Sequence, residues 1–316
     1  MNFPPIIGIL LLLPTWLFAR QPSIPEGWSD GYAYANGIRI HYYRASPQPD
    51  KPVLVMVHGV TDNGLCWATL ALKLQDMYDI YMLDARGHGL SDPFTAGDDG
   101  ETLIKDIVAF VGAMEFHNPI LMGHSIGAAT VMRLGADYPD LARAIIMLDP
   151  LLRRMGGQNR SARNNSKPNT DVSSKSATAK SKIEVNMFGN PEILVTQNNY
   201  SFEDLIALGR RQNPLWGEMD IAYWALSKKQ YHGPYTSEAA QVMTGTMNIG
   251  NALSRIQVPA IILKADAPTE VRKINEDAAV AMQKGKLVHI DGGGHNLHHD
   301  KLERTTEVIK EFLSTL

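Results

Sequence analysis

Residues 119–138, PILMGHSIGAATVMRLGADY, join a short apolar run to a stretch of helical character through the pentapeptide Gly-His-Ser-Ile-Gly. The run from Pro119 to Met122 predicts a buried strand, and the residues after Gly127 predict a helix. A serine between such a strand and helix lies on a tight turn that requires small neighbours, and its hydroxyl points into the crevice at the helix N-terminus. We therefore predict that Ser125 is a nucleophile. The alternative is a serine that only caps the helix.

The same succession of strand and helix extends over most of the chain. Gly31–Ser46 alternates apolar and polar residues around Asn36-Gly37, which is typical of a two-residue hairpin turn. Apolar runs of the kind that is buried on both faces of a parallel sheet occur at 52–59, 78–89, 119–125, 144–150, 259–266 and 286–295. Helical patterns lie near 66–75, 102–114, 127–138, 269–283 and 301–315. The order predicts an α/β fold, a doubly wound and mostly parallel eight-stranded sheet whose site lies at the carboxyl ends of its strands.

The regular order stops between residues 151 and 250. This divides the chain into a core, residues 28–150 and 251–316, and an inserted helical cap or lid. Within the insertion, residues 156–182 are rich in Ser, Asn, Lys and Arg and have almost no large apolar side chain. Such a segment cannot offset the entropy lost on ordering, so we expect a mobile loop there.

The second half of the insertion is rich in aromatic residues. Residues 202–233 contain Trp216, Tyr223, Trp224 and Tyr231 among apolar neighbours and predict helices that cover the sheet. Two interpretations of the aromatic side chains are compatible with each other. They line a substrate pocket, or they form the core of the inserted segment.

The N-terminus has the character of an export segment. Residues 1–19 carry no charged side chain, and the apolar run Ile6–Leu13 is broken by Pro14. This pattern is typical of the apolar region of a signal peptide, with Ala19 as the small residue before a cleavage point. We expect residues 1–20 to be a signal peptide or an N-terminal anchor, which places the protein outside the cytoplasm as a secreted, periplasmic or membrane-attached protein. The alternative is a buried N-terminal segment.

Composition excludes several classes of function. The chain has 30 Lys and Arg against 33 Asp and Glu in 316 residues, a net charge of −3, so it has no overall basic field to hold a nucleic-acid backbone. Its single cysteine, Cys66, rules out an intrachain disulfide and any metal site built from several cysteines. We expect Cys66 to be a small buried apolar side chain.

Five motifs in a fixed order together resemble the α/β-hydrolase fold superfamily: HGVTDNGLCW (58–67), LDARGHGLSD (83–92), GHSIGAAT (123–130), IMLDP (146–150) and GGGHN (292–296). The resemblance extends from about Gly31 to Leu316, outside the insertion. It implies the fold, a serine nucleophile, hydrolysis of a carboxylic ester or a related bond, and no cofactor. It also implies that the loop 84–89 has a structural role.

The oxyanion hole is expected from two backbone N–H groups aimed at the charge that develops in the tetrahedral intermediate. Ile126, the residue after the nucleophile, supplies one of them. The resemblance implies that Val60, just after His58-Gly59, supplies the other. The alternative for His58-Gly59 is a packing histidine beside a turn glycine.

The general base is expected to be His295. It lies in the loop after the last strand, where Gly292–Gly294 let the backbone bend toward Ser125, and a serine hydroxyl needs such a base to become a good nucleophile. His298, His299 and Asp300 follow closely and raise the alternative of a metal cluster. We interpret these histidines as solvated residues of a loop that leads into a helix, and predict no metal site.

Two carboxylates compete for the role of the triad acid, which orients the imidazole and stabilises the imidazolium. Many members of the family carry the acid in a turn after the seventh strand, but Pro268 stands where that Asp would lie. Asp149 ends the sixth strand, and Asp266 lies two residues before Pro268. Either keeps the order Ser, acid, His along the chain. We favour Asp149 because the usual turn after the seventh strand is lost.

The function expected from these residues is that of a serine hydrolase that cleaves a carboxylic ester, lactone or lipid-like substrate through a Ser-His-Asp triad and an acyl-enzyme. The alternatives are other chemistry on the same fold, such as carbon–carbon bond hydrolysis or cofactor-free perhydrolysis, and a non-catalytic ligand-binding protein. The expected partner is a small-molecule substrate, with membrane attachment through the N-terminus as a further alternative. The oligomeric state stays open.

Overall fold

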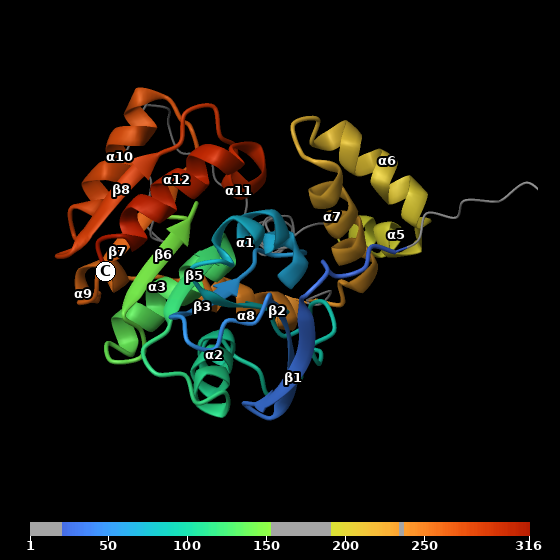
Figure 1. The fold of residues 1–316 in the computed structure, drawn as a ribbon, viewed down its shortest axis with the longest axis horizontal. Coiled ribbons are helices and arrows are strands. Elements are labelled where there is room, and N and C mark those ends of the chain that lie inside the picture. Colours follow the sequence, from blue (N-terminus) through green and yellow to red (C-terminus); the bar gives the residue numbers. More distant parts are fainter. Residues whose placement is uncertain (1–20, 153–190, 234–236) are drawn as a thin grey trace, which may run out of the picture.

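A computed structural model describes residues 21–152, 191–233 and 237–316 of the chain (Figure 1). The expected signal peptide or anchor and the expected mobile loop 156–182 lie outside the described residues. Among the described residues, no helix is long and apolar enough to cross a membrane.

An eight-stranded sheet forms the centre of the molecule, with the strand order β1-β2-β4-β3-β5-β6-β7-β8. Strands β1 and β2 form an antiparallel hairpin, β2 is antiparallel to β4, and every pair from β4 to β8 is parallel. The bounds are β1 (Ser29–Ala35), β2 (Ile38–Ala45), β3 (Val53–Val57), β4 (Asp79–Leu83), β5 (Ile120–His124), β6 (Ala144–Leu148), β7 (Ala260–Lys264) and β8 (Gly285–His289). The expected fold class is confirmed.

The strands follow the local signals of the sequence. Every residue of β4, β5 and β6 is buried, as expected for central strands of a sheet covered on both faces. The hairpin turn is formed by Asn36 and Gly37, which both have positive φ (47° and 80°), as a tight turn between twisted antiparallel strands requires.

Helices cover both faces of the sheet. Along β3, Leu54 and Met56 point into one core and Val55 and Val57 into the other, because successive side chains of a strand point to opposite faces. The first core is closed by the 3₁₀ turn η1 (Gly64–Trp67) and the helices α1 (Ala68–Leu74) and α12 (Leu302–Leu313). The second is closed by α2 (Thr102–Ala113), α3 (Ile126–Asp137), α9 (Ala252–Arg255) and α10 (Thr269–Ala279). Cys66 is buried in η1, as predicted.

The inserted segment between β6 and β7 contains α5 (Pro191–Asn199), α6 (Phe202–Gln212), α7 (Glu218–Gln230) and α8 (Ser237–Thr246). Helices α5, α6 and α7 gather beside the sheet in Figure 1, whereas α8 packs on α2 and α3. Leu205 of α6 packs with Trp224 and Ala225 of α7 in a small core of their own. Helix α7 is joined to the sheet domain at α1, where Thr69 donates a hydrogen bond to Asp220 (2.8 Å).

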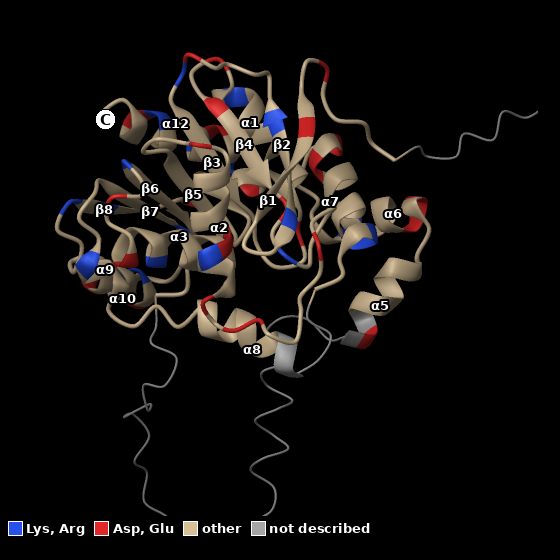
Figure 2. Cartoon of the chain, turned by 90° about the horizontal axis from the view of Figure 1, so that it is seen from below, with Lys and Arg blue, Asp and Glu red and all other residues tan. Residues whose placement is uncertain are grey.

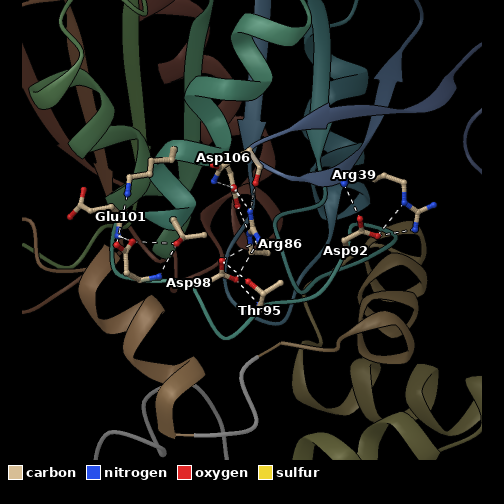
Figure 3. A network of polar contacts seen from close by, with 11 residues as sticks. Arg39, Arg86, Asp92, Thr95, Asp98, Glu101 and Asp106 are labelled. Carbon is tan, nitrogen blue, oxygen red and sulfur yellow. Dashed lines mark hydrogen bonds and ion pairs between the residues drawn. The ribbon is translucent and has the colours of Figure 1, made fainter.

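The loop after β4 is held by a network of polar side chains (Figure 3). The guanidinium of Arg86 is buried and donates to both carboxylate oxygens of Asp106 on α2 (2.9 and 2.7 Å), and it also contacts Asp98 (3.2 Å). Nearer the surface, Arg39 pairs with Asp92 (2.8 Å). The network fixes the loop that contains residues 84–92 to the hairpin and to α2.

Lys and Arg residues alternate with Asp and Glu residues along the described part of the chain, as the coloured cartoon of Figure 2 shows. This distribution agrees with the small net charge of the chain, −3.

Candidate active site

Ser125 lies on a sharp turn between β5 and α3, with φ 55° and ψ −114°. Residues other than glycine rarely adopt this backbone conformation. The flanking glycines are required by close packing. A Cβ atom at Gly123 would lie 2.1 Å from the carbonyl oxygen of Gly127, and one at Gly127 would lie 2.1 Å from the carbonyl oxygen of Val57. Glycine is therefore needed at both positions to build this turn.

His295 contacts a carboxylate from the neighbouring strand end. Its Nδ1 lies 2.6 Å from Oδ2 of Asp149, which directly follows β6. Burial disfavours the charged form of Asp149, but the hydrogen bond from His295 and the charge of Lys264 outweigh this and hold the pKa of the carboxyl well below its usual range. Since an ionised carboxylate only accepts hydrogen bonds, Nδ1 carries the proton and Nε2 is left as the basic nitrogen.

Asp266 makes different contacts. Its Oδ1 lies 2.5 Å from the guanidinium of Arg272, and its Oδ2 accepts a hydrogen bond from the backbone N–H of Gly292 (2.8 Å). The hydrogen bond from Arg272 lowers the pKa of Asp266, which lies at the surface. The structure thus brings Asp149 to His295 and uses Asp266 to brace the loop that precedes His295.

The loop of His295 is held from the core and from the cap. His124, inside the serine pentapeptide, has its Nε2 2.9 Å from the carbonyl oxygen of His295, so it donates a hydrogen bond to that oxygen. Asp300 accepts hydrogen bonds from the backbone N–H of Gly294 (2.9 Å) and from Nε1 of Trp216 in the cap (2.7 Å). The position of the imidazole is therefore set by contacts on both sides of its backbone.

The expectation that His298 and His299 are solvated is wrong. Both lie in the short helix α11 (Leu297–Asp300) and are buried, with the ring of His298 packed 4.7 Å from Trp67 and the ring of His299 4.2 Å from Trp216. Nδ1 of His299 lies 3.0 Å from Oδ1 of Asp220, outside hydrogen-bond geometry. Among the described residues, no group of three or more His, Cys, Asp or Glu side chains is arranged to hold a metal ion.

Ser125 and His295 line one cavity of about 230 Å³ between the sheet domain and the cap. Val60 lies in its wall, and Ile126 follows Ser125 at the start of α3. The backbone N–H groups of Val60 and Ile126 have no acceptor among the described residues. They are available to a ligand oxygen, as an oxyanion hole requires. A separate cavity of about 20 Å³ lies beside His58 and Gly59, and neither Ser125 nor His295 lines it.

The cap supplies the other wall of the cavity. Trp216 and Trp224 line it, and both also pack in the small core formed by α6 and α7. Lys228 of α7 lines the cavity as well, with its Nζ 2.8 Å from both the carbonyl oxygen and Oγ1 of Thr61 and 3.4 Å from Oδ1 of Asp62. These contacts tie the cap to the loop that contains Val60.

His58, by contrast, does not line the active-site cavity. It is buried, donates from Nδ1 to the carbonyl oxygen of Gly59 (2.6 Å) and accepts at Nε2 from the backbone N–H of Ala85 (3.0 Å). Burial lowers its pKa, which favours the neutral ring that these two contacts require. Its role is to join the loop after β3 to the loop after β4.

Sequence reasoning missed several polar residues of this site, among them His124, Lys228, Asp62 and Lys264, whose Nζ lies 2.5 Å from Oδ1 of Asp149. His124 and Asp62 lay inside motifs that the sequence analysis quoted, where a polar residue beside an expected active site is itself a signal. Lys264 gave a similar signal, because it is the one charged residue of an otherwise apolar buried strand. Lys228 gave none, since a lysine on a helix is usually solvated.

A sequence model of the alpha/beta hydrolase family matches residues 54–310. The chain belongs to this family. The match covers the strand ends that carry Ser125, Asp149 and His295, together with the inserted cap.

Curated relatives within the family differ in the reactions their names state. A 2-(acetamidomethylene)succinate hydrolase of Mesorhizobium japonicum is 34% identical over 98 residues, which cover 31% of this chain and 35% of the relative. An N-formylmaleamate deformylase of Pseudomonas putida is 35% identical over 121 residues, 38% of this chain and 44% of the relative. The matches thus span less than half the length of either relative. Epoxide hydrolase 1 of Caenorhabditis elegans is 22% identical over 93% of this chain and 72% of the relative.

Solved structures agree on the fold. The N-formylmaleamic acid deformylase of Pseudomonas putida S16 matches 89% of this chain and all of its own with a TM-score of 0.65 at 19% identity. An enol-lactonase from Burkholderia xenovorans matches 90% of this chain and all of its own with a TM-score of 0.60 at 18% identity. At this level of identity the comparison shows the architecture alone.

Proposed function

We propose that the protein is a serine hydrolase that cleaves a small carboxylic ester or lactone, with Ser125 as nucleophile, His295 as general base and Asp149 as the acid of the triad. The observation that carries the proposal is the 2.6 Å contact between Asp149 and Nδ1 of His295, made beside a serine on a strained strand-to-helix turn in the same cavity. Hydrolase activity as such agrees with the family to which the chain belongs.

The proposed reaction follows from the positions of these groups. Oγ of Ser125 attacks the carbonyl carbon while Nε2 of His295 takes its proton, and the charge that forms on the carbonyl oxygen faces the N–H groups of Val60 and Ile126. Collapse of the intermediate expels the alkoxide, which takes the proton from His295 and leaves as the alcohol. Water then attacks the acyl-enzyme with His295 again as base, and the carboxylic acid leaves as Ser125 regains its proton.

The cavity favours a small and polar substrate over a long acyl chain. Its volume is about 230 Å³, and its wall contains hydrogen-bonding side chains such as Gln212, Asn213 and Asn296 beside the two tryptophans. A lipid-like substrate requires a longer and more apolar channel. Among the ester, lactone and lipid-like substrates expected from the sequence, the first two therefore fit better.

A second candidate is cleavage of an N-acyl bond in a small polar compound. The polar cavity favours it, and so do two relatives whose names state a deformylase for N-formylmaleamate and a hydrolase for an acetamido compound. The same triad serves this reaction, because the tetrahedral intermediate is the same in kind and His295 protonates the leaving nitrogen. Among the described residues of the cavity, no specific contact favours carbon–carbon bond hydrolysis, perhydrolysis or a non-catalytic role.

Epoxide hydrolysis does not suit a serine nucleophile, although one relative is named as an epoxide hydrolase. Attack of Ser125 on an epoxide carbon gives an ether, which carries no carbonyl group for water to attack. The enzyme would be blocked by the first attack, before any product leaves. Epoxides are therefore proposed as poor substrates and as candidate slow inactivators.

For the N-terminal segment we propose export, since residues 1–19 are apolar and uncharged. The expected product is a secreted or periplasmic enzyme after cleavage, or a membrane-attached one without cleavage. Fractionation of producing cells, with N-terminal sequencing of the purified protein, distinguishes the two. Recovery of the intact chain from the cytoplasmic fraction would contradict the proposal.

The function is tested with a matched substrate panel on the purified protein and on Ser125→Ala. The panel contains p-nitrophenyl esters from acetate to decanoate, a small enol lactone, an N-formyl amide and a styrene oxide. We expect turnover of short esters or of the lactone by the wild type, a decline with acyl length, and none by Ser125→Ala. Turnover that persists in Ser125→Ala would remove the proposed nucleophile, and binding of these compounds without turnover would favour the non-catalytic alternative.

A further inference from the structure

Lys264, the last residue of β7, makes a close contact with the carboxylate that faces His295. Its Nζ lies 2.5 Å from Oδ1 of Asp149 and 2.9 Å from the carbonyl oxygen of Pro150. The two side chains are largely buried, with 13% of Lys264 and 11% of Asp149 exposed to solvent. The backbone N–H of Ala265 donates to the same Oδ1 (3.1 Å).

The backbone of Asp149 and the contacts from β7 together fix where the carboxylate points. Asp149 has a φ of 44°, an uncommon conformation for a residue with a side chain. Two donors from the end of β7 fix Oδ1, and this leaves Oδ2 for His295 (2.6 Å). Strands β6 and β7 are adjacent and parallel, with Leu148 opposite Leu263, so the ends of both strands meet at this point.

We propose that Lys264 is a positioning residue of the active site: it fixes the carboxylate of Asp149 toward His295 and places a positive charge beside this pair. The inference rests on the proposed function, because it treats His295 as the general base. The seventh strand, which does not supply the acid of the triad, then supplies the group that holds it.

The sign of the electrostatic effect follows from the arrangement of the three charges. The carboxylate of Asp149 attracts a proton to His295, and the ammonium of Lys264 opposes this because it is a like charge to the imidazolium. The two contacts share one carboxylate, so the ammonium lies within about 7 Å of the imidazole. At an effective dielectric of about 20, a unit charge at this distance shifts a titration by between one and two pH units, and the 54% exposure of His295 reduces the expected shift to about one. Removing that charge should move the acidic limb of activity to higher pH.

Two other imidazoles face His295 and could in principle produce such a limb. His124 lies with its ring 4.7 Å from that of His295, and burial lowers its pKa to about 4. Burial holds the pKa of His298 well below its usual range. Both rings therefore stay neutral across the acidic limb.

The charged groups around the cavity are held by ion pairs and hydrogen bonds. Although burial opposes it, the charge of Lys228 holds the pKa of Asp62 below its ordinary value across the cavity from His295. Behind the loop, Arg272 pairs with Asp266 and Asp291, and Asp300 is bound to Gly294 and Trp216. The limb thus reports on His295 with Asp149 and Lys264.

The test compares pH profiles of kcat/KM between pH 4 and 9 for the wild type, Lys264→Met, Lys264→Gln and two controls. Lys264→Arg keeps the charge, and Lys273→Met removes a lysine that is 72% exposed and pairs with Asp277. We expect the acidic limb to move up by about one pH unit in Lys264→Met and Lys264→Gln. Lys264→Arg and Lys273→Met should keep the limb of the wild type.

The value of kcat on the plateau of the pH profile separates the hydrogen bond that Lys264 donates to Asp149 from the effect of its charge. Glutamine retains a donor for Oδ1 of Asp149, so Lys264→Gln should keep more of the plateau kcat than Lys264→Met. Lys264→Gln also provides the measurement if Lys264→Met does not fold, as judged by circular dichroism. A limb at the wild-type pH in the neutral variant that folds would overturn the inference.

A failure of the proposed function gives a different result from a failure of the role proposed for Lys264. If the wild type itself shows no acidic limb, or if Ser125→Ala retains activity, then His295 is not the base and the triad is wrong. If the wild type shows the limb and the neutral variants leave it in place, the triad stands and only the role of Lys264 is lost.

Discussion

Replacement of Asp149 by Asn tests the most specific contact of the proposed triad. The amide keeps the shape of the side chain but loses the charge that lies 2.6 Å from Nδ1 of His295. In the transition state that charge faces an imidazolium, and at an effective dielectric of about 20 a pair at 3 to 4 Å interacts by about 4 to 5 kcal/mol. Because the imidazole is 54% exposed to solvent, we take the lower part of this range.

The expected result is a fall in kcat of about a thousandfold, since each decade corresponds to about 1.4 kcal/mol. Asp149→Asn also favours the tautomer of His295 that has its proton on the wrong nitrogen, which acts in the same direction. The assay is burst and steady-state hydrolysis of p-nitrophenyl acetate, with circular dichroism to show that the variant is folded.

Asp266→Asn is the matched control. Its carboxylate pairs with Arg272 at the surface and does not contact His295, and an exposed pair of this kind contributes about 1 kcal/mol or less. The control should keep kcat within about twofold of the wild type, which corresponds to less than 0.5 kcal/mol. A larger loss in Asp266→Asn than in Asp149→Asn would refute the assignment, and comparable partial losses would mean that the two carboxylates share the role.

Two further predictions concern the polar network around the loop after β4 and the helices that line the cavity. Arg86→Met should lower the free energy of unfolding by about 3 to 5 kcal/mol in urea titrations, because it leaves the buried carboxylate of Asp106 and the nearby Asp98 without their cation. An unchanged urea midpoint would show that the polar network of Figure 3 contributes little to stability. Trp216→Ala should change the preference along the ester series more than the rate at which a small fluorophosphonate labels Ser125, since Trp216 lines the cavity; equal losses for every ester and for the probe would mark the residue as structural.

The fold could be read from the sequence because its signals are local. Buried parallel strands appear as apolar runs, and the hairpin is marked by Asn36-Gly37, whose positive φ values the turn requires. The position of Ser125 followed in the same way, since the flanking glycines are dictated by contacts of about 2 Å that any side chain would create.

The sequence alone does not decide between the two candidate acids, because Asp149 and Asp266 follow two adjacent parallel strands. What separates them is the direction in which each carboxylate points. Asp266 is turned toward Arg272, six residues later, and toward the backbone of Gly292. Asp149 is fixed by Lys264 and Ala265 from the next strand. These are contacts between separate segments, which periodicity and spacing do not report.

The prediction that His298 and His299 are solvated was wrong for a related reason. His298 and His299 sit in a polar sequence that is typical of a solvated loop, but the short helix α11 places their rings against Trp67 and Trp216. Both rings are buried by packing, although Nδ1 of each has no hydrogen-bond partner among the described residues. Such packing cannot be predicted until the partner from a distant segment is known.

Labelling with a fluorophosphonate tests the central claim most directly, because the probe reacts only with a serine activated by its own active site. The purified protein would be titrated with the probe while residual ester turnover is followed, and the adduct would be located by peptide mass mapping. We predict one adduct per chain, on Ser125, and a loss of turnover in proportion to the fraction labelled. Full turnover in a fully labelled protein, an adduct on another residue, or no adduct in a protein that turns over esters would contradict the assignment of Ser125 as the nucleophile.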